Sequence, residues 1–219
     1  MGRELIIVGA GGHGREVADV VQAIQAASGD SDWTLAGFAD DSAPRGEAGE
    51  RLKRRGLRVV ATVAEVSRPG VEVVVALGDP VLRALLTQKL LAGGASLAPA
   101  LVHPSVTMGA DVELAEGVVV AAGSQLTTNI RLGRGAQVNV GCSLSHDVVL
   151  GPQATLSPGC RLTGGVTVGE GAFFGVGAVV APLVEVGDWA AVGAGSVVLH
   201  DVEPSSTVVG APARPSSNP

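Results

Sequence analysis

Two short stretches of the sequence carry residue types that could do chemistry. In one, His146 is followed directly by Asp147. A histidine can take a proton from a reacting group near neutral pH, and a neighbouring carboxylate can hold the ring tautomer that leaves one nitrogen free. In the other, the glycines of Gly9-x-Gly11-x-x-Gly14 lie between an apolar run and a helical pattern, where backbone amides favour a phosphate. From these residues alone, each stretch could equally be an ordinary turn.

The element that must position His146 is a six-residue repeat over residues 102–203, without an insertion. Every sixth residue from Val102 onwards is large and apolar, and the residues four further on are small or β-branched. This period fits neither a helix nor a flat strand and is typical of a hexapeptide parallel β-helix. Each hexad should form a short strand and a turn. Glycines that follow the large residue, such as Gly133 and Gly151, are expected at positive φ.

The elements that must position the glycine loop lie in the first hundred residues, where strand and helix patterns alternate. Strands are expected at 5–8, 33–38, 57–60 and 71–77, and helices at 15–24 and 80–91. This order predicts a small, Rossmann-like α/β domain. The expected organisation is an α/β domain at 1–95, a β-helix at 102–203 and a C-terminal tail at 204–219.

Composition excludes several classes of function. Fifteen basic against twenty-one acidic residues give a net charge of −6, the wrong sign for a general nucleic-acid binder. No segment approaches the ~18 apolar residues of a membrane span, so a cytoplasmic protein that does not enter a membrane is expected. The two cysteines, Cys142 and Cys160, give no disulfide framework and are expected to fill the core.

Three motifs follow one another along the chain: the glycine loop at 6–14, the segment 37–41 and the segment 209–214. The six-residue repeat lies between the last two. In this order the sequence resembles a known family. These are the sugar O- or N-acyltransferases of the sialic-acid O-acetyltransferase and nucleotide-aminosugar N-acetyltransferase type. The resemblance covers nearly the whole chain. It implies a left-handed β-helix, a homotrimer, acetyl-CoA bound between neighbouring solenoids, and a nucleotide sugar held by the α/β domain.

The resemblance also assigns the reacting residues. His146 matches the family's catalytic histidine, and Asp147 stands where the family has an acidic residue that orients the ring. Three hexads form one coil in this family, so residues 18 apart should stack about 4.8 Å apart. Gly164 and Gly165 then lie beside His146 and Asp147, where they leave room and free amides for a thioester or an oxyanion.

The remaining site residues follow from the resemblance in the same way. Acetyl-CoA is expected to contact Gly164, Gly165, Val176, Ala194 and Arg214. The phosphates of the nucleotide sugar are expected at Gly11, Gly12, His13 and Gly14, and its base or ribose at Asp40 and Asp41, although a structural turn explains each aspartate as well. At Thr155 the sequence departs from many relatives, which have a second histidine there.

No metal and no nicotinamide cofactor are expected. The histidines of the repeat, His103, His146 and His200, lack the spacing of paired metal ligands. The glycine loop formally matches the dinucleotide fingerprint, but Asp40 and Asp41 lie farther along than the usual ~20 residues.

The sequence is therefore interpreted as a bacterial, cytoplasmic, acetyl-CoA-dependent N-acetyltransferase that acts on a nucleotide-linked amino sugar by direct transfer, with His146 as general base. An O-acetyltransferase of sialic acid or another sugar hydroxyl would use the same residues and stays open. A nicotinamide-dependent enzyme would leave the repeat unexplained. A non-catalytic scaffold is the third alternative, because solenoids can polymerise through exposed ends.

Overall fold

The computed structural model of this 219-residue chain describes residues 3–28, 33–42 and 46–216. The chain divides into two compact units, Met1–Pro104 and Ser105–Pro219. None of the helices within those described ranges is long and apolar enough to cross a membrane.

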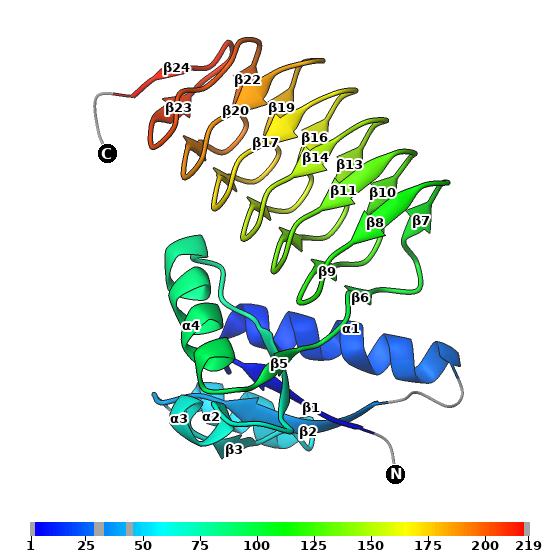
Figure 1. Cartoon of the computed structure of the whole chain (residues 1–219), viewed down its shortest axis with the longest axis vertical. Helices are drawn as coiled ribbons and strands as arrows, with labels where there is room; N and C mark the ends of the chain where they lie inside the picture. The colour runs from blue at the N-terminus through cyan, green and yellow to red at the C-terminus, as the bar shows by residue number, and fades with distance from the viewer. Residues whose placement is uncertain (1–2, 29–32, 43–45, 217–219) are drawn as a thin grey trace. The chain divides into compact units, whose positions relative to one another are not determined.

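The first unit is a parallel five-stranded sheet whose connections contain helices (Figure 1). Its strands, in the sheet order β3-β2-β1-β4-β5, are β3 (Val59–Ala61), β2 (Trp33–Ala39), β1 (Arg3–Val8), β4 (Glu72–Val75) and β5 (Ser96–Leu97). Its helices are α1 (Gly12–Ser28), α2 (Glu47–Arg54), α3 (Val63–Val66) and α4 (Pro80–Ala92), and a short strand β6 (Leu101–Val102) follows. The strand order reverses direction at β1, and ligands of such sheets bind beside the carboxyl ends of the strands at this point.

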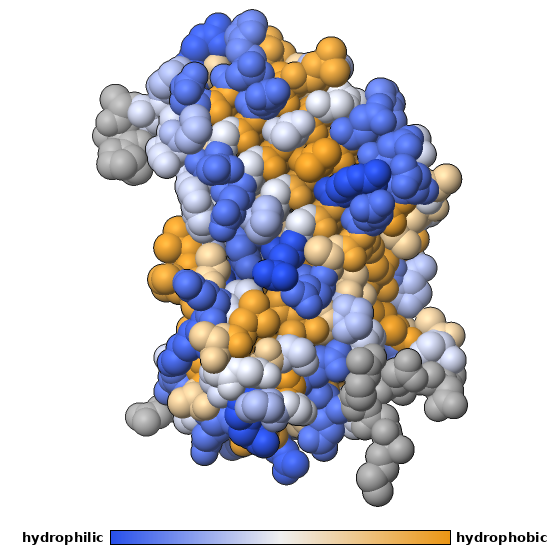
Figure 2. All heavy atoms as spheres, in the orientation of Figure 1, coloured by the Kyte–Doolittle hydropathy of each residue, from blue (hydrophilic) through white to orange (hydrophobic). Residues whose placement is uncertain are grey.

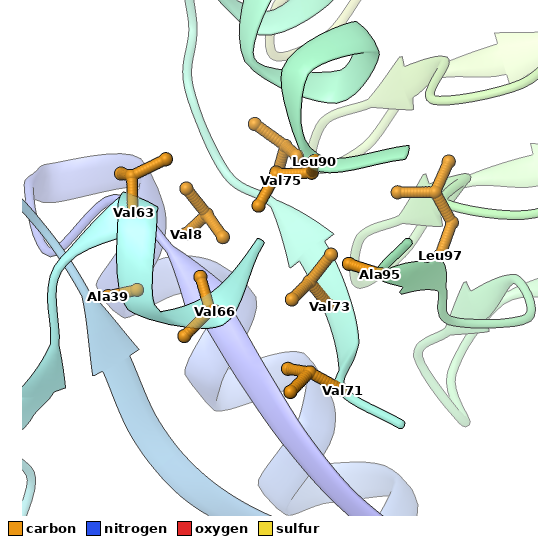
Figure 3. Close-up of a cluster of buried hydrophobic side chains, with 10 residues drawn as sticks. All are labelled: Val8, Ala39, Val63, Val66, Val71, Val73, Val75, Leu90, Ala95 and Leu97. Atoms are coloured by element: carbon orange, nitrogen blue, oxygen red, sulfur yellow. The ribbon is translucent and has the colours of Figure 1, made fainter. Parts of the chain in front are cut away.

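Small aliphatic side chains form the core of this unit. Val8 of β1, Ala39 of β2 and the valines of β4 meet side chains from α3, α4 and β5 (Figure 3). The cluster consists of Val8, Ala39, Val63, Val66, Val71, Val73, Val75, Leu90, Ala95 and Leu97. Strands buried on both faces need such runs of β-branched residues, which is why the pattern of this domain could be read from the sequence.

Three helices and two strands differ from the predicted elements: β5 was not predicted, and β3 lies at 59–61 where a strand at 57–60 was expected. Helix α1 begins at Gly12, inside the glycine motif, rather than at residue 15. Helix α2 was not predicted because it is strongly charged and buries only Leu52. Helix α3 was also missed, although Thr62 and Glu65 form a capping box, a sequence signal that could have revealed it.

The second unit is a left-handed β-helix whose triangular coils have three strand-bearing faces (Figure 1). The first face contains β7 (Thr107–Met108), β10 (Gln125–Leu126), β13 (Ser143–Leu144), β16 (Arg161–Leu162), β19 (Val179–Val180) and β22 (Val197–Val198). The second contains β8 (Val112–Leu114), β11 (Ile130–Leu132), β14 (Val149–Leu150), β17 (Thr167–Val168) and β20 (Glu185–Val186). The third contains β9 (Val119–Val120), β12 (Gln137–Val138), β15 (Thr155–Leu156), β18 (Phe173–Phe174), β21 (Ala191–Val192), β23 (Thr207–Val209) and β24 (Arg214–Pro215).

The register of the strands makes one coil three hexads long. Leu144, for example, pairs with Leu126 before it and with Leu162 after it, each 18 residues away. The large residues of the repeat are buried from Val120 to Val198, as predicted, whereas Met108 on the edge strand β7 is exposed. The apolar centre of the solenoid is thus a set of stacked aliphatic columns.

Positive φ angles recur at every sixth residue from Asp111 to Gly195, three positions after each large residue. The prediction that Gly133 and Gly151 adopt positive φ is therefore wrong. Those glycines serve close approach between coils, because a Cβ at Gly133 would lie 2.6 Å from the backbone nitrogen of Pro152. The left-handed positions are Asp111, Gly117, Gly123, Asn129, Gly135, Gly141, Asp147, Gln153, Gly159, Gly165, Gly171, Gly177, Leu183, Trp189 and Gly195.

The sheet of the third face continues past residue 203. Strand β23 pairs in parallel with β21, and β24 then runs back antiparallel along β23. Residues 207–209 and 214–215 of the predicted tail therefore continue this sheet, while 217–219 lie outside the described residues.

Candidate active site

His146 and Asp147 form a turn between β13 and β14, at one corner of a coil. His146 Nδ1 lies 2.7 Å from Asp147 Oδ2. Because a carboxylate can only accept, Nδ1 carries the hydrogen, and Nε2 of the neutral ring is left as an acceptor. The two side chains are 64% and 62% exposed. Asp147 adopts φ 63°, a left-handed conformation that aspartate tolerates better than most residues.

The glycine of the next coil lies directly against the His146 ring. The amide of Gly165 donates to the carbonyl oxygen of His146 at 2.9 Å, which fixes the stacking of the two turns. A Cβ built on Gly164 would lie 2.3 Å from Cε1 and 2.4 Å from Nε2 of the ring. Only a glycine therefore leaves room for the ring in this position.

The sequence predicted that the backbone amides of Gly164 and Gly165 are both free, but only one of them is. The Gly165 amide is engaged with His146, whereas the Gly164 amide makes no hydrogen bond to any described residue. The corner therefore brings together a ring nitrogen that can accept a proton and one backbone donor beside it.

The structure places the other expected cofactor contacts apart from His146. We name the corners of the solenoid by their residues: the His corner (146–147, 164–165, 182–183), the charged corner (116–117, 134–135, 152–153, 170–171, 188–189) and the apolar corner (122–123, 140–141, 158–159, 176–177, 194–195). Val176 and Ala194 are exposed on the apolar corner, where the Gly195 amide donates to the Val176 carbonyl at 2.8 Å. One chain therefore does not bring them to His146.

Arg214 lies near the C-terminal end of the solenoid, on the exposed strand β24. Its Nη1 donates to the carbonyl of Ala213 at 2.9 Å. Together with His200 and Asp201 it lines a pocket of about 330 Å³. His200 belongs to the same 18-residue column as His146, but three coils further along.

The glycine loop follows β1 in the first unit and opens helix α1. Gly9 has φ 105°, and its amide donates to Ala39 at 2.9 Å. A Cβ on Gly14 would lie 1.9 Å from the Gly9 carbonyl oxygen, so the helix can begin against the loop only with glycine there. By contrast, a Cβ on Gly11 would meet nothing within 4 Å, and one on Gly12 only the tip of an arginine at 4.0 Å. The loop thus combines open space with a helix N-terminus, the geometry that suits a phosphate.

The two aspartates after β2 accept hydrogen bonds from the backbone. Asp40 accepts from the amides of Ala10 and Ser42, both at 2.8 Å, through different oxygens. Asp41 accepts from the amide of Val63 at 2.8 Å, at the start of α3. The structure therefore supports their structural role and ties Asp40 to the glycine loop.

His13 lies in the first turn of α1, next to the same loop. Its Nδ1 lies 3.3 Å from Glu16 Oε2, and its side chain is mostly buried. The first turn of the helix contains no acidic residue, and the first carboxylate along the helix, that of Glu16, is held against His13.

The cysteines lie in the centre of the solenoid and not at the candidate site. Cys142 and Cys160 are buried free thiols that contact the carbonyl oxygens of Ser157 at 3.2 Å and Gly175 at 3.3 Å. The neighbouring Cys142 thiol and burial both raise the pKa of the Cys160 thiol. Among the described residues, no group of three or more histidines, cysteines or acidic residues could hold a metal ion.

Sequence reasoning missed one residue of this corner, Leu183. It occupies the left-handed position one coil after Gly165, with φ 63°, and is 78% exposed. Its Cδ2 would lie 2.6 Å from a Cβ on Gly165. The signal in the sequence was a leucine 36 residues after Asp147, at a turn position that suits glycine or asparagine.

Comparison with known proteins places this geometry in a family. Residues 4–90 match the family described as the PglD N-terminal domain. PerB from Caulobacter crescentus, solved in complex with CoA and GDP-perosamine, is 34% identical, with 98% of this chain and 97% of that chain covered and a TM-score of 0.84. The chain belongs to the hexapeptide-repeat sugar acyltransferases.

Two further solved structures are similar to this chain. The acetyltransferase domain of PglB from Neisseria gonorrhoeae FA1090 is 30% identical, with 98% and 100% of the two chains covered and a TM-score of 0.85. WeeI from Acinetobacter baumannii AYE is 27% identical, with the same coverage and a TM-score of 0.81. No curated protein sequence was found to match. The predicted family, fold class and acyltransferase activity are confirmed, in place of a nicotinamide-dependent enzyme or a scaffold.

Proposed function

We propose that this acyltransferase transfers the acetyl group of acetyl-CoA to the amine of a nucleotide-linked amino sugar. The observation that carries the proposal is the His146 ring, which contacts Asp147 through Nδ1 at 2.7 Å and is stacked on Gly164. Two relatives support the ligands: PerB was solved with CoA and GDP-perosamine, and the PglB domain with acetyl coenzyme A at 28% identity.

The proposed reaction needs no covalent enzyme intermediate. The neutral sugar amine attacks the carbonyl carbon of the thioester, and a C–N bond forms. His146 Nε2 takes one proton from that nitrogen, the C–S bond breaks, and the departing CoA sulfur receives a proton from the imidazolium. The products are the amide and CoA thiol. The buried cysteines are poor nucleophiles for an alternative route through an acyl-enzyme.

The Gly164 amide is suited to the negative charge that develops during this reaction. The attacked carbonyl oxygen becomes an oxyanion, and a backbone N–H held in place before the reaction stabilises it without reorganisation. Gly164 offers that donor beside the base, and its lack of a side chain keeps the approach open.

We further propose that acetyl-CoA binds between neighbouring copies of a homotrimer. Val140 and Val176 on the apolar corner are 49% and 57% exposed, which favours contact with a second copy. On the face seen in Figure 2, hydrophobic residues are exposed along the solenoid with polar residues on either side. A second copy would bring its Val176 and Ala194 toward the His corner of the first, and Arg214 would then bind a phosphate of CoA.

The acceptor is proposed to bind through the first unit. The backbone amides at Gly11, Gly12 and Gly14, with His13 beside them, would hold the phosphates of the nucleotide at the start of α1. Asp40 shapes this loop through its bond to Ala10, and Asp41, the next residue in the chain, would contact the ribose or base.

A thiol-release assay tests the function. Purified wild type and His146→Ala are mixed with acetyl-CoA and with UDP-, GDP- or dTDP-linked 4-amino sugars, and sialic acid serves as the hydroxyl acceptor. Glu170→Ala is the matched control, because Glu170 has the same turn position on the charged corner. Release that needs an amino sugar and His146 is expected. Release with sialic acid alone would replace the proposal with O-acetylation, and full activity of His146→Ala would refute the role of the base.

A further inference from the structure

Leu183 is an unusual residue for its backbone conformation. A branched side chain in the left-handed region costs roughly 1–2 kcal/mol relative to glycine, and such strain is concentrated at functional sites. At the same position of the His corner the preceding coils have Asp111, Asn129, Asp147 and Gly165, residues that suit this conformation. Leu183 is also the most exposed of the large hydrophobic residues in the described part of the chain. Because little of its side chain is buried, burial does not offset the strain.

The His146 ring and the Leu183 side chain extend over adjacent residues of the same glycine turn, from the coils on either side of it. The ring extends from one coil over Gly164, and the leucine extends back from the coil after it over Gly165, each close enough to exclude a Cβ there. The two turns are bonded to the glycine turn between them, from Gly165 N to His146 O at 2.9 Å and from Leu183 N to Gly164 O at 3.0 Å. The Gly164-Gly165 turn is therefore bordered by a basic ring on one side and by an apolar side chain on the other.

His146 and Leu183 are separated by two steps of the solenoid. Stacked strands are about 4.8 Å apart, so the backbones that carry the two side chains are about 10 Å apart. Both side chains extend over the glycine turn between those backbones. An acyl carbon needs about 3.5–4 Å to each neighbouring atom, so only a short acyl chain separates a thioester carbonyl beside the ring from the leucine.

The geometry points to Leu183 as the residue that sets the acyl length of the donor. This inference rests on the proposed function. With the thioester carbonyl oxygen directed at the Gly164 amide and its carbon within reach of an amine beside Nε2, the methyl group of the acetyl is directed toward the Leu183 side chain. Leu183 contacts that methyl group and excludes longer acyl chains.

The test compares acyl donors on variants of this one residue. Rates of thiol release from acetyl-, propionyl- and butyryl-CoA are measured, with one amino-sugar acceptor, for wild type, Leu183→Ala and Leu183→Met. One methylene in an apolar pocket is worth at least about tenfold in discrimination. We therefore expect Leu183→Ala to raise the propionyl to acetyl ratio of kcat/KM about tenfold, while Leu183→Met, which keeps the bulk, stays near the wild-type ratio.

Thermal unfolding and gel filtration distinguish a change in acyl preference from a change in folding or in assembly, and the wild-type rate tests the proposed function itself. Leu183→Gly relieves the strained conformation and should raise the Tm while relaxing the acyl preference. If Leu183→Ala keeps the wild-type acyl ratios, or if it changes them only by dissociating the oligomer in gel filtration, the inference is overturned. If the wild type transfers no acyl group to any amine, the proposed function fails instead.

Discussion

Replacing Gly164 by alanine should disable the base without unfolding the protein. The new Cβ would lie 2.3 Å from Cε1 of His146. Because carbon atoms approach to about 3.5 Å at closest, the ring has to move by about 1.2 Å. The ring is largely exposed and can rotate outward. This movement relieves the clash but displaces Nε2.

The magnitude follows from the displacement. A misplacement of about 1 Å can lower a rate about 100-fold, which is the fall in kcat that we expect for Gly164→Ala. Stability should stay the same or rise, since the φ of Gly164 is not in the left-handed region and alanine restricts the unfolded chain by about 0.4–1 kcal/mol. Thiol release with saturating substrates gives kcat, and thermal unfolding gives the Tm.

The double variant separates this explanation from a general disturbance. If Gly164→Ala acts only by moving the ring, it should lower the rate little further in a His146→Ala background. Equal 100-fold losses in both backgrounds would refute the reasoning and would indicate that the alanine blocks the thioester or turns away the Gly164 amide. Unchanged kcat in the single variant would refute the ring position itself.

Four other perturbations test separate parts of the structure. Asp147→Asn should lower kcat by at least about 100-fold with little change in CoA binding measured by calorimetry, because an amide can donate to Nδ1 and place the proton on Nε2. Asp40→Ala should raise the KM for the nucleotide sugar and lower the free energy of unfolding by about 2 kcal/mol, since it leaves two backbone amides without their acceptor. Cys142 and Cys160 should react with a thiol reagent only after unfolding, and rapid labelling of the folded protein would contradict their burial. Hydrogen bonds from the backbone and hydroxyl of Thr62 lower the pKa of Glu65, so its contribution to stability is present above the ordinary glutamate pKa and is lost as the pH falls through the lowered one. In denaturant unfolding, Glu65→Ala should therefore destabilise the protein at pH 7, and the loss should shrink as the pH is lowered below the ordinary glutamate pKa; a loss that is independent of pH would contradict this.

The solenoid could be predicted from the sequence because one period governs both its core and its turns. The large residues at every sixth position specify the stacked columns, and Leu144 with its partners confirms the 18-residue coil. The backbone angles could not be read in the same way. Glycine is needed at Gly133 for close approach and at Gly135 for positive φ, and the sequence does not distinguish these two reasons.

The candidate site was predictable only in part. His146 and Asp147 are adjacent in sequence, and Gly164 follows from the six-residue period together with the three hexads per coil that the family resemblance implies. The role of Asp40 depends on a bond to Ala10, 30 residues away, which no local pattern indicates. Leu183 was missed because an exposed leucine in a turn has no chemical signature until its strained conformation is known.

The coil length of 18 residues also limits how the chain can change in length. A deletion of one hexad between His146 and Gly164 would rotate all later residues by one corner and place a residue of the charged corner beside the base. A deletion of a full coil beyond Leu183 would leave every corner in phase and merely shorten the solenoid. Natural or engineered variants of this protein should therefore gain or lose length downstream of the His corner only in whole coils of 18 residues.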